Sequence, residues 1–485
     1  MRSTTLKIFA LAAALVAGGV LGHFVAPEQG SFAQVGPGGE LADAFPPGAL
    51  FYVGANLPGE LIDRIPLTAS AARVRGRKDL LDFEEYLGHL LHLNVLGPST
   101  IKALLGVRAA AAVYPTTADG TMSVVIATRP TGAARVALPL LLARLGRSQG
   151  EWQGVKLYGL GRDPRVERRP VLAIVRGRLI FATRRELAQA AVEAAAGGAS
   201  LGRDAEFSAA PAAAPDPAAF AYVWLRPSLL RGGWSDQPAL RTALGTIAPS
   251  ACVSYASIVQ NRVVVRPVEP AVPFVLPGAV AELAGTYLSG AALKRLLPDL
   301  RREGVVDATW EDTVALLEGS EYVGVSCTGF APVIHGTVSG PMLVGVVPTS
   351  DAARLHAVNH HLVSLALSRY FSSDSANMSF ADETAPDGTL SYNVIGVFSP
   401  STVARDGRAY TTIFKPVLDH DLSGLLRERP ADFALSWRPD ATRLATRDNL
   451  AISGPYLVMI FIDRADLSFK LGADGQFHGG LSLVF

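Results

Sequence analysis

The sequence predicts an α+β fold of two similar halves, each with antiparallel hairpins and helices packed on one face, after an N-terminal membrane or signal helix. Short aromatic strands that follow a proline recur at Phe51, Phe220 and Phe433. Hairpins and helices follow one another in groups, whereas a parallel βαβ fold alternates them singly. Hydrophobic residues make up 49% of the 485 residues and charged residues 18%, which is typical of a chain with large buried cores.

The N-terminus predicts a membrane anchor. Arg2 and Lys7 precede an uncharged apolar run at residues 8–26, which is close to the length of a helix that spans a bilayer. A signal peptide cleaved after Ala33 is the alternative, although that site lies well past the apolar run. With the basic residues before the run and Glu28 after it, the body is expected outside the cytoplasm in both cases.

Internal similarity predicts a duplication. Trp224 follows Phe220 by the same spacing as Trp437 follows Phe433, and repeated spacing of this kind indicates repeated structural units. A proline-rich stretch at residues 267–277 is the expected boundary between the two units. We therefore predict a signal or anchor with a short linker at residues 1–40, a first α+β unit at 41–270 and a second at 271–485.

In the first unit, turn and capping residues define the expected elements. Asp119-Gly120, Gly177 and Gln260-Asn261 are typical of tight hairpin turns, and Thr183 is expected to cap a helix. The elements, in order, are helices at 79–93 and 99–105, strands at 108–114 and 122–128, a helix at 133–145, a hairpin at 171–182, a helix at 186–196 and a hairpin at 252–268.

The second unit repeats this series. Its expected elements are a helix at 311–317, strands at 322–330 and 342–348, a helix at 351–368, a hairpin at 401–412, a helix at 421–427 and a late hairpin within 456–485. Gly407 and the segment from Gly472 to Gly475 supply the turns. The polar insert 372–389 is expected to be a surface loop.

A family resemblance follows from particular segments: LADAFPPGALFYVGANL, EWQGVKLYGL, VLAIVRGRLIFATRRELAQAAVEAAAGGASL and AFAYVWL. Over residues 41–230 the chain resembles the bacterial "domain of unknown function 3352" family. The resemblance implies an N-terminal signal or membrane segment followed by a large extracytoplasmic region. It implies no catalytic residues.

The search for metal, cofactor or catalytic residues gives only incomplete motifs. His356 and His360 share one face of an expected helix, but the glutamate of a zinc-protease motif is missing, which favours partly exposed helix histidines without a metal. Ser99 and Lys102 have the spacing of penicillin-recognising enzymes without the companion motifs, and Ser99 fits a helix N-cap. Gly159-Leu-Gly161 lacks the third glycine of a dinucleotide loop. We therefore expect no catalytic, cofactor or metal residue.

The two cysteines leave two interpretations open. Cys252 and Cys327 lie in apolar strand-like runs, one in each unit. In an oxidising compartment they could pair and join the two units. Two small buried thiols would have the same sequence pattern.

Charge and the missing catalytic motifs favour a binding function. The 44 basic and 43 acidic residues nearly cancel, so no nucleic-acid partner is expected. We predict a membrane-tethered binding or scaffold module of the bacterial cell envelope, not an enzyme, whose partners are the membrane and an envelope protein. A carrier of an apolar ligand such as a lipid, and a hydrolase whose residues are spread over loops, are the alternatives.

Overall fold

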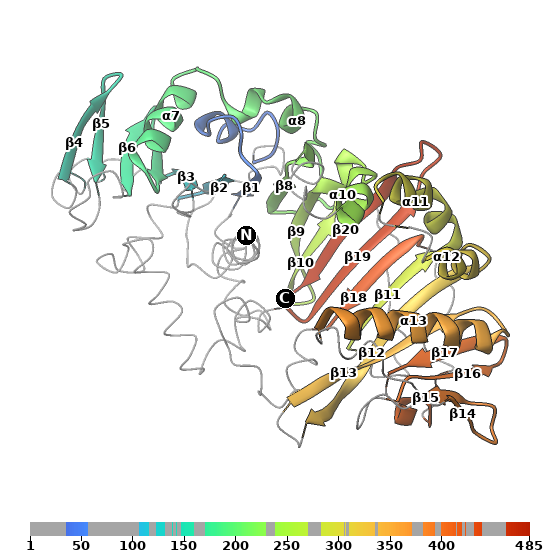
Figure 1. The fold of residues 1–485 in the computed structure, drawn as a ribbon. Helices are drawn as coiled ribbons and strands as arrows, with labels where there is room; N and C mark the ends of the chain where they lie inside the picture. The colour runs from blue at the N-terminus through green and yellow to red at the C-terminus, as the bar shows by residue number, and fades with distance from the viewer. Residues whose placement is uncertain are drawn as a thin grey trace.

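The computed structural model describes residues 35–56, 106–115, 123–130, 138, 142, 147–159, 170–228, 238–269, 283–304, 306, 310–334, 338–370, 382–392, 399–413, 415–419, 422, 431–438 and 462–485. Twenty strands in these residues join in a single sheet (Figure 1). The first ten are β1 (Phe51–Asn56), β2 (Arg108–Tyr114), β3 (Ser123–Arg129), β4 (Arg147–Trp152), β5 (Val155–Gly159), β6 (Val171–Val175), β7 (Arg178–Ala182), β8 (Ala221–Leu225), β9 (Val253–Val259) and β10 (Arg262–Pro267).

The remaining strands follow residue 283. They are β11 (Ala284–Ser289), β12 (Tyr322–Ile334), β13 (Val338–Val347), β14 (Asp382–Thr384), β15 (Leu390–Tyr392), β16 (Ser401–Arg405), β17 (Arg408–Thr412), β18 (Phe433–Trp437), β19 (Arg464–Leu471) and β20 (Phe477–Val484). The helices are α7 (Arg185–Ala195), α8 (Ala205–Ser208), α10 (Pro238–Gly245), α11 (Gly290–Arg302), α12 (Glu311–Glu318) and α13 (Ala352–Tyr370). Short 3-10 turns are η2 (Ala42–Ala44), η5 (Leu201–Arg203), η6 (Pro249–Cys252) and η9 (Lys415–Asp419).

The strand pairing corrects the predicted fold class. Every neighbouring pair is antiparallel, and the order across the sheet is β4-β5-β6-β7-β3-β2-β1-β8-β9-β10-β20-β19-β18-β11-β12-β13-β17-β16-β15-β14. The expectation of an α+β fold with separate sheets is therefore wrong. The protein is mostly one large antiparallel sheet with few helices.

The two sheets expected from the sequence are joined through β10 and β20. Val264 pairs with Val484 and Val265 with Leu483. The β20 strand also contacts η6, and the backbone N–H of Phe477 donates to the carbonyl of Thr246, which precedes η6. Because the ladder continues through this contact, no sheet edge separates the strands before residue 270 from those after it. The domain boundaries remain a prediction.

The strand order is the same in both sets of ten strands. Each strand of the second set occupies the place of the strand numbered ten lower in the first set. The two strands at the junction, β10 and β20, thus hold corresponding positions and run antiparallel. This arrangement is that of two copies related by a two-fold axis perpendicular to the sheet.

Small residues let the first core pack closely. On β2, Ala110 and Ala112 face η2, α7 and α8, which lie on one side of the strands (Figure 1). Buried rings fill the space beside them, and Phe207 of α8 contacts Tyr52 and Trp224 edge to face. The short alanine side chains allow the covering turns to approach the sheet, so aromatic burial is concentrated around Phe207.

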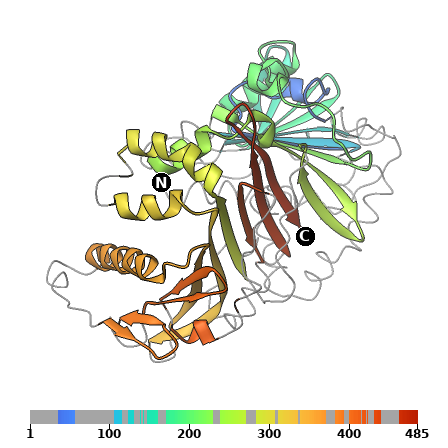
Figure 2. The same ribbon diagram turned by 90° about the vertical axis from the view of Figure 1, so that its right-hand side faces the viewer.

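In the second set of strands, the face equivalent to the first core packs Tyr287 and Val344 with Val417 and Leu418 of η9, and helices cover the other face. Figure 2 shows α11, α12 and α13 on one side of this part of the sheet. Ser289 caps α11 by accepting a hydrogen bond from the backbone N–H of Ala292. Ala292 of α11 packs with Phe469 and Phe477 of the sheet. Leu355 and Val358 of α13 are buried against the sheet.

Several predicted hairpins are confirmed. Positive φ angles occur at Arg176-Gly177, Gln260-Asn261 and Asp406-Gly407, where the sequence placed tight turns. Two expectations are wrong. Thr183 does not cap α7, because its hydroxyl accepts from the backbone N–H of Val124 on β3. The insert 372–389 is not wholly a loop, since it contains β14.

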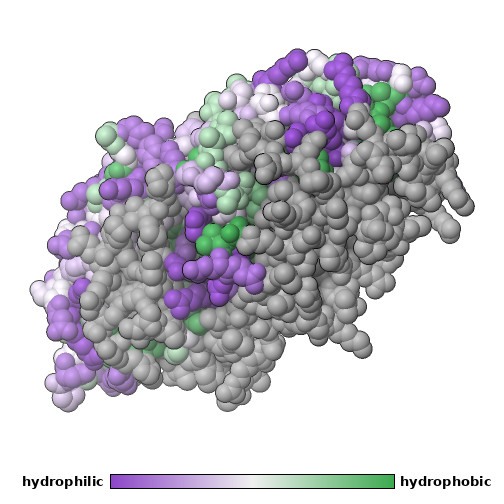
Figure 3. All heavy atoms as spheres, turned by 180° about the vertical axis from the view of Figure 1, so that it is seen from behind, coloured by the Kyte–Doolittle hydropathy of each residue, from purple (hydrophilic) through white to green (hydrophobic). Residues whose placement is uncertain are grey.

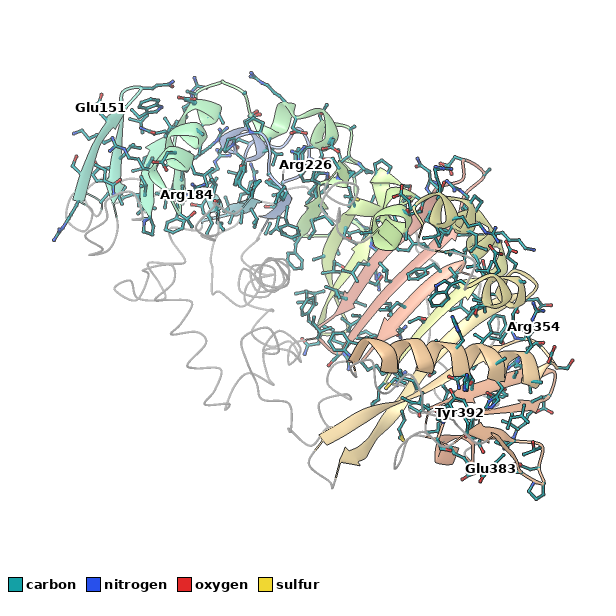
Figure 4. All side chains as sticks on the ribbon, viewed as in Figure 1. Glu151, Arg184, Arg226, Arg354, Glu383 and Tyr392 are labelled. Atoms are coloured by element: carbon teal, nitrogen blue, oxygen red, sulfur yellow. The ribbon has the colours of Figure 1, made fainter. Side chains whose placement is uncertain are left out.

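The sheet ends are poor sites for strand addition. Among the described residues, β4 and β14 each pair with one neighbour only, and Glu151 and Glu383 mark them at opposite ends of the structure (Figure 4). β4 is polar and irregular between Ser148 and Glu151, while β14 has three residues, two of them acidic. Short, charged or bulged edges resist pairing with another chain.

The predicted anchor at residues 8–26 lies outside the described part of the chain, as do the helices expected at 79–93 and 99–105. Within the described residues, no helix has both the length and the apolar character needed to cross a membrane. Of the helix expected at 133–145, Leu138 and Leu142 are described, and both are helical and buried against Leu179.

Candidate functional site

Two rows of side chains on one sheet face form the strongest candidate for a binding surface. Thr286 of β11 lies opposite Val325 of β12 and Leu435 of β18. In the next row, Leu343 lies opposite Cys327. We call these two rows the open strip; its members are Gly345, Val325, Thr286, Leu435, Leu467 and Leu481 in the first row, and Leu343, Cys327, Ala284, Trp437, Ala465 and Leu483 in the second.

Four members of the open strip are exposed, namely Val325, Leu343, Leu435 and Thr286, whereas Cys327 within the second row is buried. Val325 is 38% exposed, and Leu343 and Leu435 are each 37% exposed. In the view from behind, the described surface is mostly hydrophilic and hydrophobic residues form only small areas (Figure 3). Large aliphatic side chains that share one exposed sheet face are typical of an interaction surface.

The helices explain where the open strip begins. α11 covers the row adjacent to it, in which Leu288 and Phe433 pack with Phe469. In the next row, Thr286 and Leu435 are not covered by α11 and are exposed to solvent. The strands β19, β18 and β11 are seen face-on in Figure 1, between α11 and α12 on one side and α13 on the other. The strip is therefore a sheet surface framed by helices.

Sequence reasoning missed the open strip because its residues come from six strands. The available signal is local alternation, as in Phe433, Leu435 and Trp437, where every second residue of β18 is apolar. Alternation predicts an apolar face. It does not indicate how far a helix covers that face, because cover depends on segments distant in the sequence.

The histidines considered for zinc lie in the interface between α13 and the sheet. His356 Nδ1 is 3.2 Å from Thr402 Oγ1, and the rings of His356 and His360 both contact the ring of Tyr392, which lies beneath α13 (Figure 4). His361 contacts Trp310. No group of three metal-ligating side chains is present among the described residues.

A chain of polar hydrogen bonds fixes the position of α13. Asn359 Nδ2 donates to Thr411 Oγ1 at 2.6 Å, and the hydroxyls of Thr411 and Thr402 lie 3.0 Å apart. His356, Asn359 and Thr402 are buried. Buried polar groups of this kind are satisfied by one another and specify packing. The sequence favoured partly exposed histidines, which holds for His360, whereas His356 is buried.

The structure does not bring the cysteines together. Cys252 immediately precedes β9 and Cys327 lies on β12, and neither is in a disulfide. Six strand-to-strand steps separate β9 from β12. At about 4.8 Å per step, this separation is several times the roughly 6 Å between bridged Cα atoms. Burial raises the pKa of the Cys327 thiol, which suits an inert core residue.

The other predicted motifs give no assembled site. Ser99 and Lys102 lie outside the described residues. Gly159 ends β5 and packs against the side chain of Gln149. Among these motifs, the described residues therefore provide no phosphate loop or nucleophile–base pair.

Comparison of the chain with protein-family models, with curated proteins and with solved structures gives no match. The resemblance to the "domain of unknown function 3352" family remains a prediction.

A histidine between two carboxylates gives a pH-dependent contact near the β19–β20 turn. His478 Nε2 is 3.1 Å from Asp474 and Nδ1 is 3.3 Å from Glu269. Partial desolvation lowers the pKa of His478, but the hydrogen bond to Asp474 and the charges of Glu269 and Asp474 outweigh it, so the pKa is raised. The protonated form is thus favoured in the folded state.

We expect this contact to weaken at alkaline pH. A raised pKa stabilises the fold fully below the pKa of about 6.5 found in unfolded chains, and the contribution is lost as pH rises through the folded value. His478→Gln should remove this dependence. Thermal unfolding of both proteins between about pH 5.5 and 8.5 measures it, and equal pH dependence in both would contradict the assignment.

Proposed function

We propose that this protein is a binding module of the bacterial cell envelope, tethered by its N-terminal segment, that presents the open strip to a protein partner outside the cytoplasm. The exposure of Val325, Leu343 and Leu435 on one face of the sheet, within four consecutive strands, is the observation that carries the proposal. Burying such side chains stabilises an association by about 25 cal/mol per Å² of apolar surface. The acidic or bulged sheet ends support recognition through the face of the sheet.

A protein partner fits the shape of the open strip. Its residues lie on neighbouring strands of a continuous antiparallel sheet. Val325, Leu343 and Leu435 are each more than a third exposed to solvent. Carriers of lipids, by contrast, bury most of the ligand in a concave site. Protein interfaces have an apolar centre with a polar rim. The aliphatic side chains of Val325 and Leu435, on either side of Thr286, would form such a centre.

Site-specific crosslinking tests the proposal. A photoreactive phenylalanine analogue at Leu435 of the full-length protein, in native cells, should form one discrete protein adduct. The same analogue at Arg354, an exposed residue of α13 (Figure 4), is the matched control and should not form that adduct. An adduct with the mass of a lipid at Leu435, or equal adducts at both positions, would contradict a protein partner.

Charge placed on the open strip should remove the adduct without unfolding the protein. We expect Val325→Asp combined with Leu343→Asp to lower crosslinking at Leu435 by at least about tenfold, because aspartate desolvation opposes burial. Both side chains are more than a third exposed, so the free energy of unfolding should fall by only about 1–2 kcal/mol per site, from lost packing and from the low strand propensity of aspartate. Unchanged crosslinking in a folded double variant would refute the role of the strip.

A further inference from the structure

Three arginines lie side by side across the first set of strands. Arg108 begins β2, Arg129 ends β3 and Arg178 begins β7. Arg108 of β2 lies opposite Arg129 of β3. Between β3 and β7, Thr128 lies opposite Leu179, so the neighbouring residues Arg129 and Arg178 are also level with each other. By the two-residue alternation of strands, all three share the face that carries Ala110, Ala127 and Ile180 of the buried core.

One carboxylate serves all three guanidinium groups. Glu40 Oε2 is 2.8 Å from Arg129 Nη1 and 3.3 Å from Arg108 Nη1, while Glu40 Oε1 is 3.8 Å from Arg178 Nε. Guanidinium groups stay protonated at all ordinary pH values. Within the described part of the chain, these three positive charges face one negative charge, that of Glu40. Like charges on neighbouring strands repel one another.

Two of the arginines retain unused donors in a buried setting. Arg108 is 8% exposed, and the Nε atoms of Arg108 and Arg178 are buried without a hydrogen-bond partner. Leaving a buried donor unsatisfied costs about 1–3 kcal/mol, more when it is charged. The outer side of the cluster is open, because the side chains of Arg129 and Glu40 are 39% and 36% exposed.

We propose that Arg108, Arg129 and Arg178 form a binding site for a phosphate group. A phosphate dianion matches the two positive charges that exceed the charge of Glu40 among the described residues, and its tetrahedral oxygens accept hydrogen bonds from several guanidinium groups at once. Glu40 occupies the site as an internal competitor, and its partly exposed side chain can swing away toward solvent. The site lies on strands remote from the open strip and is independent of the function proposed above.

Inorganic phosphate is the first probe. Full-length protein is titrated with phosphate, with chloride at equal ionic strength as the reference, and binding is followed by calorimetry and by thermal unfolding. Arg129→Gln should weaken phosphate binding about tenfold, the loss expected for one charge-assisted hydrogen bond. Arg354→Gln, which removes an exposed arginine elsewhere, is the matched control and should bind like the wild type.

The Glu40→Gln variant distinguishes a phosphate site from a purely structural cluster, because only a phosphate site would let added phosphate restore its stability. Without phosphate this variant should unfold at a lower temperature, because three cations then lack a counter-charge. With phosphate the unfolding temperature should recover, and the affinity should exceed that of the wild type because the competitor has been removed. Failure of phosphate to bind the wild type and to restore this variant would overturn the proposal.

The source of the phosphate is a separate comparison. Binding to vesicles that contain phosphatidic acid, but not to vesicles of phosphatidylcholine alone, would assign the site to a lipid headgroup if Arg129→Gln reduces it. Binding of inorganic phosphate without Arg129-dependent vesicle binding would assign it to a soluble phosphate. Equal phosphate affinity in wild type, Arg129→Gln and Arg354→Gln would show that the arginines do not form the site.

Discussion

Phe207→Ala is expected to lower the free energy of unfolding by about 3–5 kcal/mol, the range for removing a large aromatic group from a core. Phe207 is fully buried, and its ring centre lies 5.0 Å from that of Tyr52, 5.1 Å from Trp224 and 6.1 Å from Tyr222. Alanine would leave a cavity bordered by three rings that belong to paired strands. These rings cannot close the gap without disturbing the ladder between β1 and β8.

Urea unfolding followed by tryptophan fluorescence measures this loss, since Trp224 lies beside the substituted ring. Phe207→Leu is the matched control and should cost less than half as much, because most of the volume is retained. A loss below about 1 kcal/mol for alanine would mean that the site collapses freely, and it would contradict the central role of the ring.

Arg226→Met is expected to destabilise the protein by about 3 kcal/mol or more, because it leaves partly buried carboxylates without their cation. Arg226 Nη2 lies 2.6 Å from Asp204 Oδ2, and Nη1 lies 2.6 Å from Glu206 Oε2. Nε donates to the carbonyl of Ala49, and the guanidinium lies over the ring of Trp224. Arg226 thus links β8, α8 and the segment before β1 (Figure 4).

The pH dependence of the Arg226 variant gives a second readout. Desolvation alone would raise the pKa of Asp204, but the hydrogen bond and charge of Arg226 outweigh it, so the pKa is lowered. A lowered pKa contributes stability above the unfolded value of about 3.9, and this is lost as pH falls through the folded value. Arg226→Met should therefore lose less stability than the wild type between about pH 5 and 3.

An exposed ion pair serves as the control for Arg226. Arg302 Nη2 lies 2.8 Å from Asp299 Oδ1, and its side chain is 74% exposed. Arg302→Met should cost about 1 kcal/mol or less, as is usual for surface pairs. Equal losses in the two variants would show that burial of the Arg226 network contributes nothing beyond an ordinary surface contact.

Local structure could be predicted well where turn chemistry is decisive. Glycine at position 177 and asparagine at 261 adopt positive φ, which few other residues tolerate, and both hairpins formed where the sequence placed them. The helix at residues 311–318 and that at 352–370 also match their predicted positions. These elements are specified by neighbouring residues, so no distant contact is needed to recognise them.

The joining of the strands into one sheet could not be predicted in the same way. It depends on the pairing of Val264 with Val484 and of Val265 with Leu483. Valine and leucine occur in many strands of the chain, so these residues do not indicate which strands pair. The same limit applies to the arginine cluster, because Arg108, Arg129 and Arg178 become neighbours only through strand register. Their positions at strand ends carry no sequence signal of convergence.

The antiparallel contact between β10 and β20 has a consequence for how such a chain arose. Corresponding strands of two copies meet there, as in the self-complementary interface of a symmetric homodimer. A gene that encoded one set of ten strands would yield a subunit with β10 as an open edge, and open edges pair with an identical edge. Tandem fusion of two such genes turns that dimer into a single chain, fixes the stoichiometry at two, and frees each copy to diverge.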